Sequence, residues 1–518
     1  QTASTPPHEF PDEITQRARF SIIFAALLAL FLGAMDALIM SAAMPTIVSD
    51  LGGLPLYSWV YSAYFLARAV SLPIFGKLAD LYKNRTLFLT SIGIFLAGSI
   101  MAGAGPNMTF LIVARVIQGI GAGGNFALVY IVLADVAPPQ NRGRTISLAS
   151  SIWGIASVLG PTLGGVIVTY FSWRWIFYIN VPLGLASMVG LALYLVEMRP
   201  KKKTVALDWA GVFTLSVAIL ALLALFLTGG RTHAWHTPPM IALLLLTLAA
   251  VAGFYFAEKR AREPILALQF FGVKGFRIGN GAVFFSSFTI FSYFAYAPLF
   301  IQGAMAKTPI QVGMAMLFLS LGWSLGSLVL GQIFKRPDQR PAAVVGALCL
   351  VGGCAATLFF DADTAMATCA VVFTIIGIGM GFVTLSTLLV VQNSIDNADL
   401  GVATTSHQFA RTLGGTVGIG ICGGLVTARM SVVGDLLAEH DTSGGGWGRS
   451  LDDLQLQVEN LLRPEFQARL PEEVRQVLQS AVADGVSLVF WTVLAAALLC
   501  LLFCAVLPDR GQSKPTRS

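Results

Sequence analysis

The chain has 518 residues, of which 56% are hydrophobic and only 12% are charged, and its mean hydropathy is +0.75. Soluble globular domains carry about 25% charged residues, so this chain has too little charge to cover a water-facing surface of its size. The formal net charge of +6 is concentrated in short loops, which is typical of membrane topology and not of nucleic-acid binding. Composition therefore predicts an all-α polytopic membrane protein surrounded by membrane lipids.

A membrane-spanning helix needs about 20 mostly apolar residues. Segments of this kind follow one another along the chain, and we expect about fourteen transmembrane helices. Their predicted ranges are 20–43, 57–76, 86–105, 109–135, 145–168, 175–197, 208–228, 239–257, 278–303, 311–333, 342–360, 365–391, 402–428 and 486–507. An even number of spans places both termini on the same side of the membrane.

Basic residues gather near both termini and in every second predicted loop. The other short loops carry few of them, such as Arg231 and Lys307. Short cytoplasmic loops of membrane proteins are enriched in lysine and arginine. We therefore predict a multi-pass protein of the cell membrane with both termini in the cytoplasm.

One loop on the predicted outer side is long, at about residues 430–485. Apolar residues recur in it at helical spacing, namely at Leu451, Leu454, Val458 and Leu461 and again at Val474, Leu478 and Val482. This pattern favours a helical excursion that lies on the membrane surface. A lid that handles substrate is the alternative.

Two ten-residue stretches resemble each other, Gly76–Arg85 after the second span and Gly331–Arg340 after the tenth. If the seventh and eighth spans are an insertion, each stretch follows the second span of a six-helix unit, as in the internal repeats of many secondary transporters. The predicted organisation is a cytoplasmic segment at 1–19, a six-helix bundle at 20–197, a linker with two extra transmembrane helices at 198–274, a second six-helix bundle at 275–507 that includes the loop 430–485, and a cytoplasmic tail at 508–518.

Four motifs place glycine and polar residues inside or next to these spans. They are the loop with Gly76, Asp80, Lys83 and Arg85; Arg115 and Gln118 in the fourth span; Gly160, Pro161, Gly164 and Gly165 in the fifth; and the segment around Arg411 in the thirteenth. Pro161 removes a helix hydrogen bond and favours a kink. The glycines beside it leave a smooth packing face, which suits a helix that slides or rocks.

These motifs resemble those of the major facilitator superfamily, and within it the fourteen-span drug:proton antiporters of the multidrug efflux type. The resemblance covers almost the whole chain. It implies the major facilitator fold, with two six-helix bundles and two extra helices between them. It also implies that the loop from Gly76 to Arg85 is a cytoplasmic gating loop and that the segment from Gly160 to Gly165 is the motif associated with antiporters. Leu81 and Lys83 depart from the family pattern, which usually has arginine and glycine there.

Asp36 is the acidic residue that lies well inside a predicted span, and the segment around it resembles the first helix of the family, whose aspartate is functional. Burial disfavours a charged carboxylate, while a nearby arginine favours it, so such a group can load and release a proton. Asp36 and Arg115 lie at similar depths, about 10 Å below the surface at 1.5 Å per residue, and can face each other. We predict proton coupling through them; a fixed pair that only holds helices together is the alternative.

The charged residues deep in the predicted spans are one acid, Asp36, and three arginines, Arg68, Arg115 and Arg411. This excess of positive charge does not favour dications as substrates and leaves room for anionic, zwitterionic or lipid-like substrates. Phe284, Phe288 and Phe291 recur at helical spacing in the ninth span. They are either packing aromatics or the wall of a substrate cavity. We add Gln118 and His407 to the predicted cavity residues, and His407 is either a hydrogen-bonded packing residue or a proton carrier.

We expect a secondary active transporter, not an enzyme: a proton-coupled antiporter that exports small hydrophobic or amphiphilic compounds by alternating access. Protons are the coupling ion, and we expect no cofactor, no metal and no nucleic-acid partner; the sequence contains no Walker-type loop. We also expect a monomer. The first alternative is an exporter of a lipid or glycolipid. The others are a polytopic membrane enzyme, for which the scattered histidines offer no third metal ligand, and a non-transporting sensor.

Overall fold

The computed structural model describes residues 15–137, 142–197, 208–228, 236–261, 268–333, 339–395, 400–440 and 472–508. Across these ranges the chain forms helices and turns, without a strand. Thirteen of the described helices are long and apolar enough to cross a membrane. A further helix, α2 (Tyr57–Leu81), is 25 residues long and carries Arg68, Lys77 and Asp80 among its apolar residues. The predicted all-α polytopic membrane fold with about fourteen spans is therefore confirmed.

The first bundle is built around α1, which packs against α4, α5 and α7. Every residue of α1 from Leu32 to Pro45 is buried, as expected for a helix that is hydrophobic all round. In addition, α2 packs against α4, and α3 packs against α4 and α7. The bounds are α1 (Gln16–Leu51), α2, α3 (Asn84–Gly103), α4 (Met108–Val136), α5 (Arg142–Tyr170), α6 (Trp175–Tyr178) and α7 (Asn180–Tyr194), with a 3-10 turn η1 (Leu54–Leu56) before α2.

The second bundle is built around α10, which packs against α13, α14 and α17. The helix α11 packs against α13, and α12 against α13 and α17. The bounds are α10 (Lys274–Leu299), continued by a π-helical turn η4 (Phe300–Ala304), α11 (Pro309–Ile333), α12 (Arg340–Thr357), α13 (Met366–Asn393), α14 (Leu400–His440) and α17 (Glu472–Ala505). A 3-10 segment η3 (Leu268–Gly272) precedes α10.

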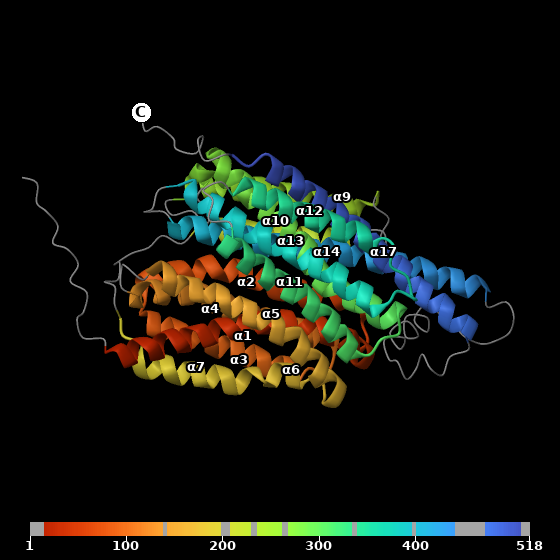
Figure 1. Cartoon of the computed structure of the whole chain (residues 1–518), viewed down its shortest axis with the longest axis horizontal. Helices are drawn as coiled ribbons and strands as arrows, with labels where there is room; N and C mark the ends of the chain where they lie inside the picture. The colour runs from red at the N-terminus through yellow and green to blue at the C-terminus, as the bar shows by residue number, and fades with distance from the viewer. Residues whose placement is uncertain are drawn as a thin grey trace, which may run out of the picture.

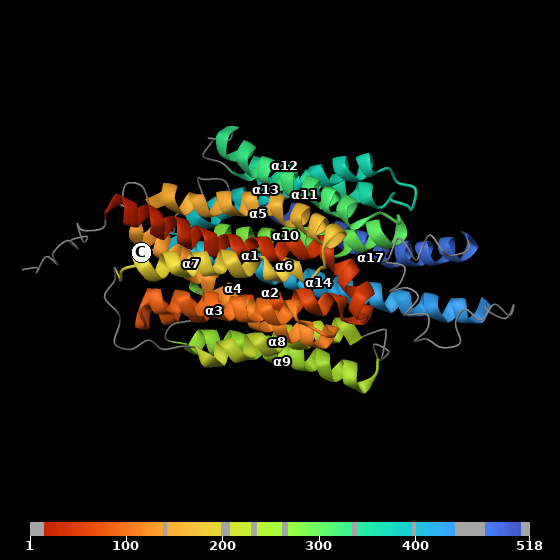
Figure 2. The ribbon, with the colours of Figure 1, turned by 90° about the horizontal axis from the view of Figure 1, so that it is seen from below.

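Two extra helices, α8 (Trp209–Thr228) and α9 (Pro238–Arg260), lie side by side along one edge of the molecule (Figure 2). The helix α8 packs against α14 of the second bundle and α2 of the first, and α9 packs against α8. The apolar contact includes Ile219 and Leu223 of α8, which pack in one cluster with Leu66 of α2 and Phe409 of α14. The extra helices therefore attach to the outside of both bundles.

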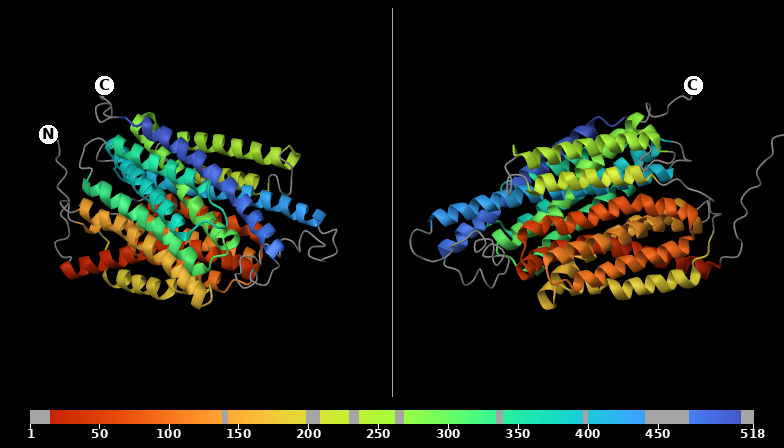
Figure 3. Two further views of the ribbon diagram at one scale, coloured as in Figure 1. Left: turned by 45° about the vertical axis from the view of Figure 1, so that its right-hand side comes forward. Right: turned by 180° about the vertical axis from the view of Figure 1, so that it is seen from behind.

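The two bundles meet along two seams, one between α2 and α14 and the other between α5 and α11. The helix α1 begins and α17 ends at the same end of the molecule (Figure 1), which we call the terminal end; the opposite end is the far end. The two views of Figure 3 show that the helices of both bundles run along a common direction between these ends.

Several element bounds differ from the predicted ones. The sixth span is broken at Ile179 into α6 and α7. The predicted loop at 430–485 is helical at both edges, because α14 runs on to His440 and α17 begins at Glu472. Val482 is thus a residue of α17 and not of a separate surface helix, whereas the stretch from Leu451 to Leu461 lies outside the described residues. Half of the stretch Gly331–Arg340, at 334–338, and the two terminal segments at 1–14 and 509–518 also lie outside the described residues.

Glycines allow α3 and α4 to pack with their backbones in contact. A Cβ atom on Gly98 of α3 would overlap the backbone nitrogen of Gln118, and a Cβ atom on Gly121 of α4 would overlap the backbone of Phe95. Close backbone approach through small residues is typical of membrane helices. The contact fixes the position of the Gln118 side chain next to Ser99.

We expect Gly98→Ala to destabilise the protein by about 1–3 kcal/mol, because the added methyl group must push α3 away from α4. Gly93→Ala on the same helix is the matched control, since a Cβ atom there meets nothing within 4 Å. It should be neutral or stabilise by up to about 1 kcal/mol through helix propensity. Size-exclusion chromatography of heated, detergent-solubilised variants measures the difference. Equal stability of the two variants would contradict the close contact.

Candidate functional site

The first bundle encloses a network of polar side chains around Asp36. The Asp36 carboxylate accepts hydrogen bonds from Arg115 Nη1 at 2.6 Å, Gln118 Nε2 at 2.7 Å and Asn180 Nδ2 at 3.2 Å. The hydroxyl of Ser99 accepts from Gln118 at 3.1 Å and from Asn180 at 2.9 Å. All five residues are fully buried. We call this set (Asp36, Ser99, Arg115, Gln118 and Asn180) the Asp36 network.

The network joins four helices, because its members come from α1, α3, α4 and α7. An ion pair taken out of water is stabilising only when its geometry is good and its remaining polar atoms find partners. Here both carboxylate oxygens of Asp36 accept hydrogen bonds, and Arg115 Nη1 makes a second one to Gln118 Oε1 at 2.7 Å. The aspartate and the arginine that the sequence placed at similar depth are thus in direct contact.

Tyrosines of α2 lie over one side of the Asp36 network. The Arg115 guanidinium carbon lies 4.1 Å from the centroid of the Tyr64 ring, a cation–π contact. The Tyr64 hydroxyl donates to the carbonyl oxygen of Gly33 at 3.2 Å, and the Tyr61 hydroxyl donates to that of Met40 at 3.1 Å. The network is therefore in contact with α2, the helix that forms one seam with the second bundle.

The motif from Gly160 to Gly165 lies where α5 meets two other helices. Cβ atoms on Gly160 and Gly164 would press on α1 at Leu38 and Ile39. A Cβ atom on Gly165 would lie only 3.3 Å from the Cα of Gly313 in α11. The motif thus provides the smooth face predicted from the sequence, with Pro161 inside α5, and part of that face lies in the α5–α11 seam.

The predicted gating loop lies at the terminal end, away from the Asp36 network. Gly76 and Asp80 belong to the last turns of α2, and α3 begins after Lys83. Lys83 and Arg85 are exposed. The Asn84 backbone N–H donates to Glu197 Oε2 at 2.8 Å, which ties the start of α3 to the chain after α7.

Between the bundles, two arginines pack among aromatic rings. The guanidinium carbon of Arg68 lies 3.7 Å from the Phe126 ring centroid and 5.7 Å from that of Trp153. The guanidinium carbon of Arg411, from the other bundle, lies 4.5 Å from the Trp153 centroid and 4.9 Å from that of Trp323. We call the set of side chains that meet here the arginine–aromatic cluster: Phe65, Arg68, Phe126, Trp153, Phe291, Trp323 and Arg411.

Only one of the three predicted phenylalanines reaches the arginine–aromatic cluster. The Phe291 ring lies 5.1 Å from that of Phe65 and 6.4 Å from that of Trp323, centroid to centroid. Phe284 and Phe288 instead meet the glycine face of α14, at Gly414 and Gly418. They pack within the second bundle.

His407 is fully buried between α14 and α13. Its Nε2 atom lies 3.0 Å from the Thr387 hydroxyl, and its Nδ1 atom has no hydrogen-bond partner among the described residues. Arg411, one turn further along α14, donates a long hydrogen bond of 3.4 Å to Gln408 Oε1. His407 therefore lies behind the arginine–aromatic cluster, inside the second bundle.

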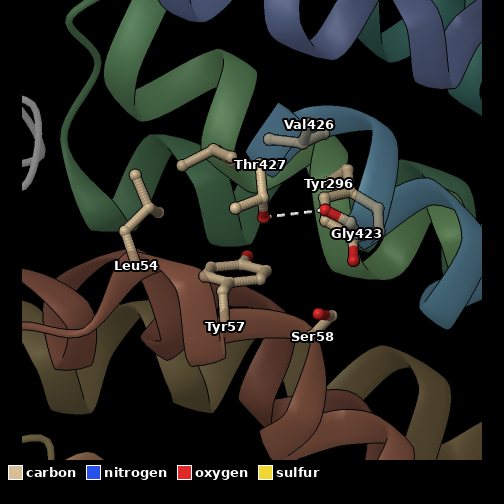
Figure 4. Close-up of a pocket in the computed structure, with 8 residues that line it drawn as sticks. Leu54, Tyr57, Ser58, Tyr296, Gly423, Val426 and Thr427 are labelled. Atoms are coloured by element: carbon tan, nitrogen blue, oxygen red, sulfur yellow. Dashed lines mark hydrogen bonds between the residues drawn. The ribbon is translucent and has the colours of Figure 1, made fainter. Parts of the chain in front are cut away.

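At the far end the two bundles are in direct contact. The Tyr57 hydroxyl donates to the carbonyl oxygen of Ala295, and the Tyr57 and Tyr296 ring centroids are 5.7 Å apart. A small pocket remains between η1, α2, α10 and α14 (Figure 4), where Ser58 faces Gly423. The Tyr296 hydroxyl donates to the carbonyl oxygen of Ile419 at 2.7 Å.

Sequence reasoning missed several members of both sites. Ser99 and Asn180 are small polar residues in apolar spans, and Trp153 and Trp323 are single tryptophans in mid-span. Asn180 could have been found because asparagine is rare inside a membrane span, where an amide without a hydrogen-bond partner is costly. Nothing in the sequence shows that Trp153 and Trp323 meet, because they belong to different bundles.

One bundle encloses a buried polar network, and the two bundles meet at a cluster of charged and aromatic side chains. This arrangement is typical of a membrane transport protein. Residues 26–419 match the model of the Major Facilitator Superfamily, and the chain belongs to this family. The fold that the motif resemblance implied is thus confirmed.

The chain is similar to multidrug transporters over almost its whole length. It is 32% identical to the multidrug transporter protein MdtP of Bacillus subtilis, over 92% of this chain and 91% of the relative. It is 30% identical to the efflux pump dotC of Dothistroma septosporum, over 96% of this chain and 85% of the relative. These relatives confirm the resemblance to the multidrug efflux type.

Solved structures of the same fold match despite low identity. A bacterial homolog to the human lysosomal transporter Spinster, in an inward-facing and unoccupied conformation, has a TM-score of 0.65 at 13% identity, over 95% of this chain and 98% of that chain. The D-xylose-proton symporter has a TM-score of 0.55 at 15% identity, over 88% of this chain and 98% of that chain. At these identities the likeness shows the fold alone.

We expect Arg115→Gln to destabilise the protein by about 3–5 kcal/mol, because it leaves the Asp36 carboxylate buried without its cation. The double variant Asp36→Asn/Arg115→Gln should be more stable than Arg115→Gln alone, since no unpaired charge remains. Thermal unfolding of the purified variants in detergent measures both changes. A double variant less stable than Arg115→Gln would contradict the pairing as the source of the effect.

Proposed function

We propose that the chain is a proton-coupled antiporter that exports hydrophobic or amphiphilic compounds by alternating access. The observation that supports this most is the Asp36 network. Asp36 and Glu258 are the buried carboxylates of the described residues, and Glu258 lies at the end of α9, whereas Asp36 lies deep in α1. A carboxylate held this deep is the group that can carry a proton through a membrane.

Protonation of Asp36 removes the negative charge that holds Arg115. Arg115 then keeps its hydrogen bond to Gln118 and its cation–π contact with the Tyr64 ring. The hydrogen bonds between α1 and α4 therefore loosen, while the contact of α4 with α2 remains. Because α2 also forms the far-end contact through Tyr57, a proton on Asp36 biases whether the bundles stay closed there. A ligand or proton shifts a conformational equilibrium only by its preference for one state.

The basic loops support a cytoplasmic terminal end, with both termini in the cytoplasm of a cell-membrane protein. The far end then faces outside, and its contacts correspond to a state closed to the outside. Substrate taken up from the cytoplasmic side would leave after the far-end contacts open. We propose that this role makes the chain a transporter and not an enzyme, with the relatives that are multidrug transporters as further support.

The first test is proteoliposome transport of a fluorescent hydrophobic probe, Hoechst 33342, driven by an imposed pH gradient. We expect Asp36→Asn to reduce gradient-driven movement at least about tenfold, because a positioned proton-transfer group contributes about 10²–10⁴-fold to a rate, while probe binding persists. Asp50→Asn is the matched control: Asp50 lies on the same helix, but its side chain is 46% exposed. If Asp36→Asn transports like the wild type, proton coupling through Asp36 is wrong.

The same vesicles test export of a lipid, which is the second candidate suggested by the excess of deep arginines. Gradient-driven movement of a fluorescent phosphatidylcholine without movement of Hoechst 33342 would favour a lipid substrate over small compounds. Movement of Hoechst 33342 alone would favour multidrug efflux.

Alternating access predicts that locking the far end stops transport. Ser58 of α2 and Gly423 of α14 face each other at this end, and a Cβ atom on Gly423 would overlap the Cβ atom of Ser58. The Cβ atoms of a disulfide are about 3.8 Å apart, so α2 and α14 must separate slightly for the bond to form, and the bond then holds them together. We expect the oxidised pair Ser58→Cys/Gly423→Cys to be inactive and to regain transport on reduction. Each single cysteine variant controls for reactions with the native cysteines. Full transport by the cross-linked protein would exclude opening at this end.

A further inference from the structure

The arginine–aromatic cluster holds more hydrogen-bond donors than it can use. Arg68 is 3% exposed, and its Nε and Nη1 atoms have no hydrogen-bond partner among the described residues. The same is true of Arg411 Nη2 and of Trp153 Nε1, with Arg411 6% exposed. A buried donor that is left without a partner costs about 1–3 kcal/mol, and more when it is charged.

No carboxylate of the described residues forms an ion pair with these two arginines. The buried acid of the neighbouring network, Asp36, already accepts hydrogen bonds from Arg115, Gln118 and Asn180. Aromatic rings surround the guanidinium groups and offer a negative ring face, and the hydroxyl-bearing side chains of Tyr64 and Tyr130 also lie near Arg68. None of these groups is a carboxylate. Two positive charges therefore remain without a counter-ion within the part of the chain that the structure describes.

The two guanidinium groups lie beside the same tryptophan ring. Their carbon atoms lie 5.7 and 4.5 Å from the same Trp153 ring centroid, so they can be no more than about 10 Å apart. Guanidinium groups bind carboxylates and phosphates with two parallel N–H donors. They also come from opposite bundles, so an anion that binds both would hold α2 and α14 together.

We propose that the arginine–aromatic cluster binds the carboxylate or phosphate headgroup of a single-chain anionic amphiphile, with its apolar part against Trp323 and Phe291. This assignment rests on the proposed export function and specifies its substrate class. The headgroup satisfies the orphan donors of Arg68, Arg411 and Trp153, and the aromatic rings cover the apolar part, as in most ligand sites. A neutral amphiphile would leave the two positive charges without a counter-ion, and a cationic one would be repelled by them.

The test is a binding titration on the purified full-length protein in maltoside detergent. The probe is 11-(dansylamino)undecanoic acid, and its primary amide is the neutral counterpart; energy transfer from tryptophan to the dansyl group reports binding above protein-free micelles. We expect the wild type to bind the acid at least about tenfold more tightly than the amide, the range of a charged hydrogen bond. Equal affinities of the wild-type protein for the acid and the amide would overturn the proposal.

The variants Arg68→Gln and Arg411→Gln are each expected to weaken binding of the acid by about ten- to a hundredfold and to leave binding of the amide unchanged. Arg68→Lys and Arg411→Lys keep the charge and should retain part of the preference. Arg277→Gln is the control, since Arg277 is exposed at the start of α10. If both glutamine variants still bind the acid more tightly than the amide by the wild-type factor, the anion binds elsewhere in the protein.

Two further arms separate the sources of the anion and the two proposals. Displacement of the acid probe by phosphatidylglycerol, but not by phosphatidylcholine, would overturn the single-chain source in favour of a phospholipid headgroup. In proteoliposomes, gradient-driven movement of both acid and amide with equal binding would overturn the anion site and leave the transport function standing. A strong preference for the acid without gradient-driven movement would support the anion site and overturn the transport function.

Discussion

The buried ion pair of Asp36 and Arg115 is the interaction on which the first bundle depends. It lies where α1, α3, α4 and α7 meet. Gln118 and Asn180 donate hydrogen bonds to the Asp36 carboxylate, and Gln118 Oε1 accepts one from Arg115. Removing one partner of such a pair leaves a charge in a place that water cannot reach. The helices around it must therefore keep their register, and the close glycine contact between α3 and α4 serves this register directly.

A chain of contacts joins the pair to the arginine–aromatic cluster. Arg115 stacks on Tyr64, and Tyr64 lies one helical turn before Arg68 on the same helix. Arg68 in turn shares the Trp153 ring with Arg411 of the second bundle. These contacts connect Asp36 to α2 at the point where the two bundles meet.

Much of the fold could be read from the sequence, because a bilayer imposes a simple rule on span length and on charge. Counting residues along helices predicted that Asp36 and Arg115 lie at matching depths, and the two side chains are in contact. Contacts between bundles could not be derived this way: Trp153 and Trp323 are ordinary mid-span aromatics until the fold brings α5 and α11 together. The spacing of Phe284 and Phe288 left both packing and a cavity wall open, and only their contact with Gly414 and Gly418 of α14 shows where they lie. The bounds of α14 and α17 were also beyond the sequence, because amphipathic spacing cannot tell a surface helix from the extension of a membrane span.

The attachment of α8 gives the molecule two unlike flanks. On one flank α8 packs against both α2 and α14, so it covers the seam between them. The helix α9 packs against the outer side of α8. The other seam is formed by α5 and α11 themselves, with glycines such as Gly165 and Gly313 at the contact. A hydrophobic molecule that approaches sideways from the lipid therefore meets a wall two helices thick on one flank and a thin one on the other.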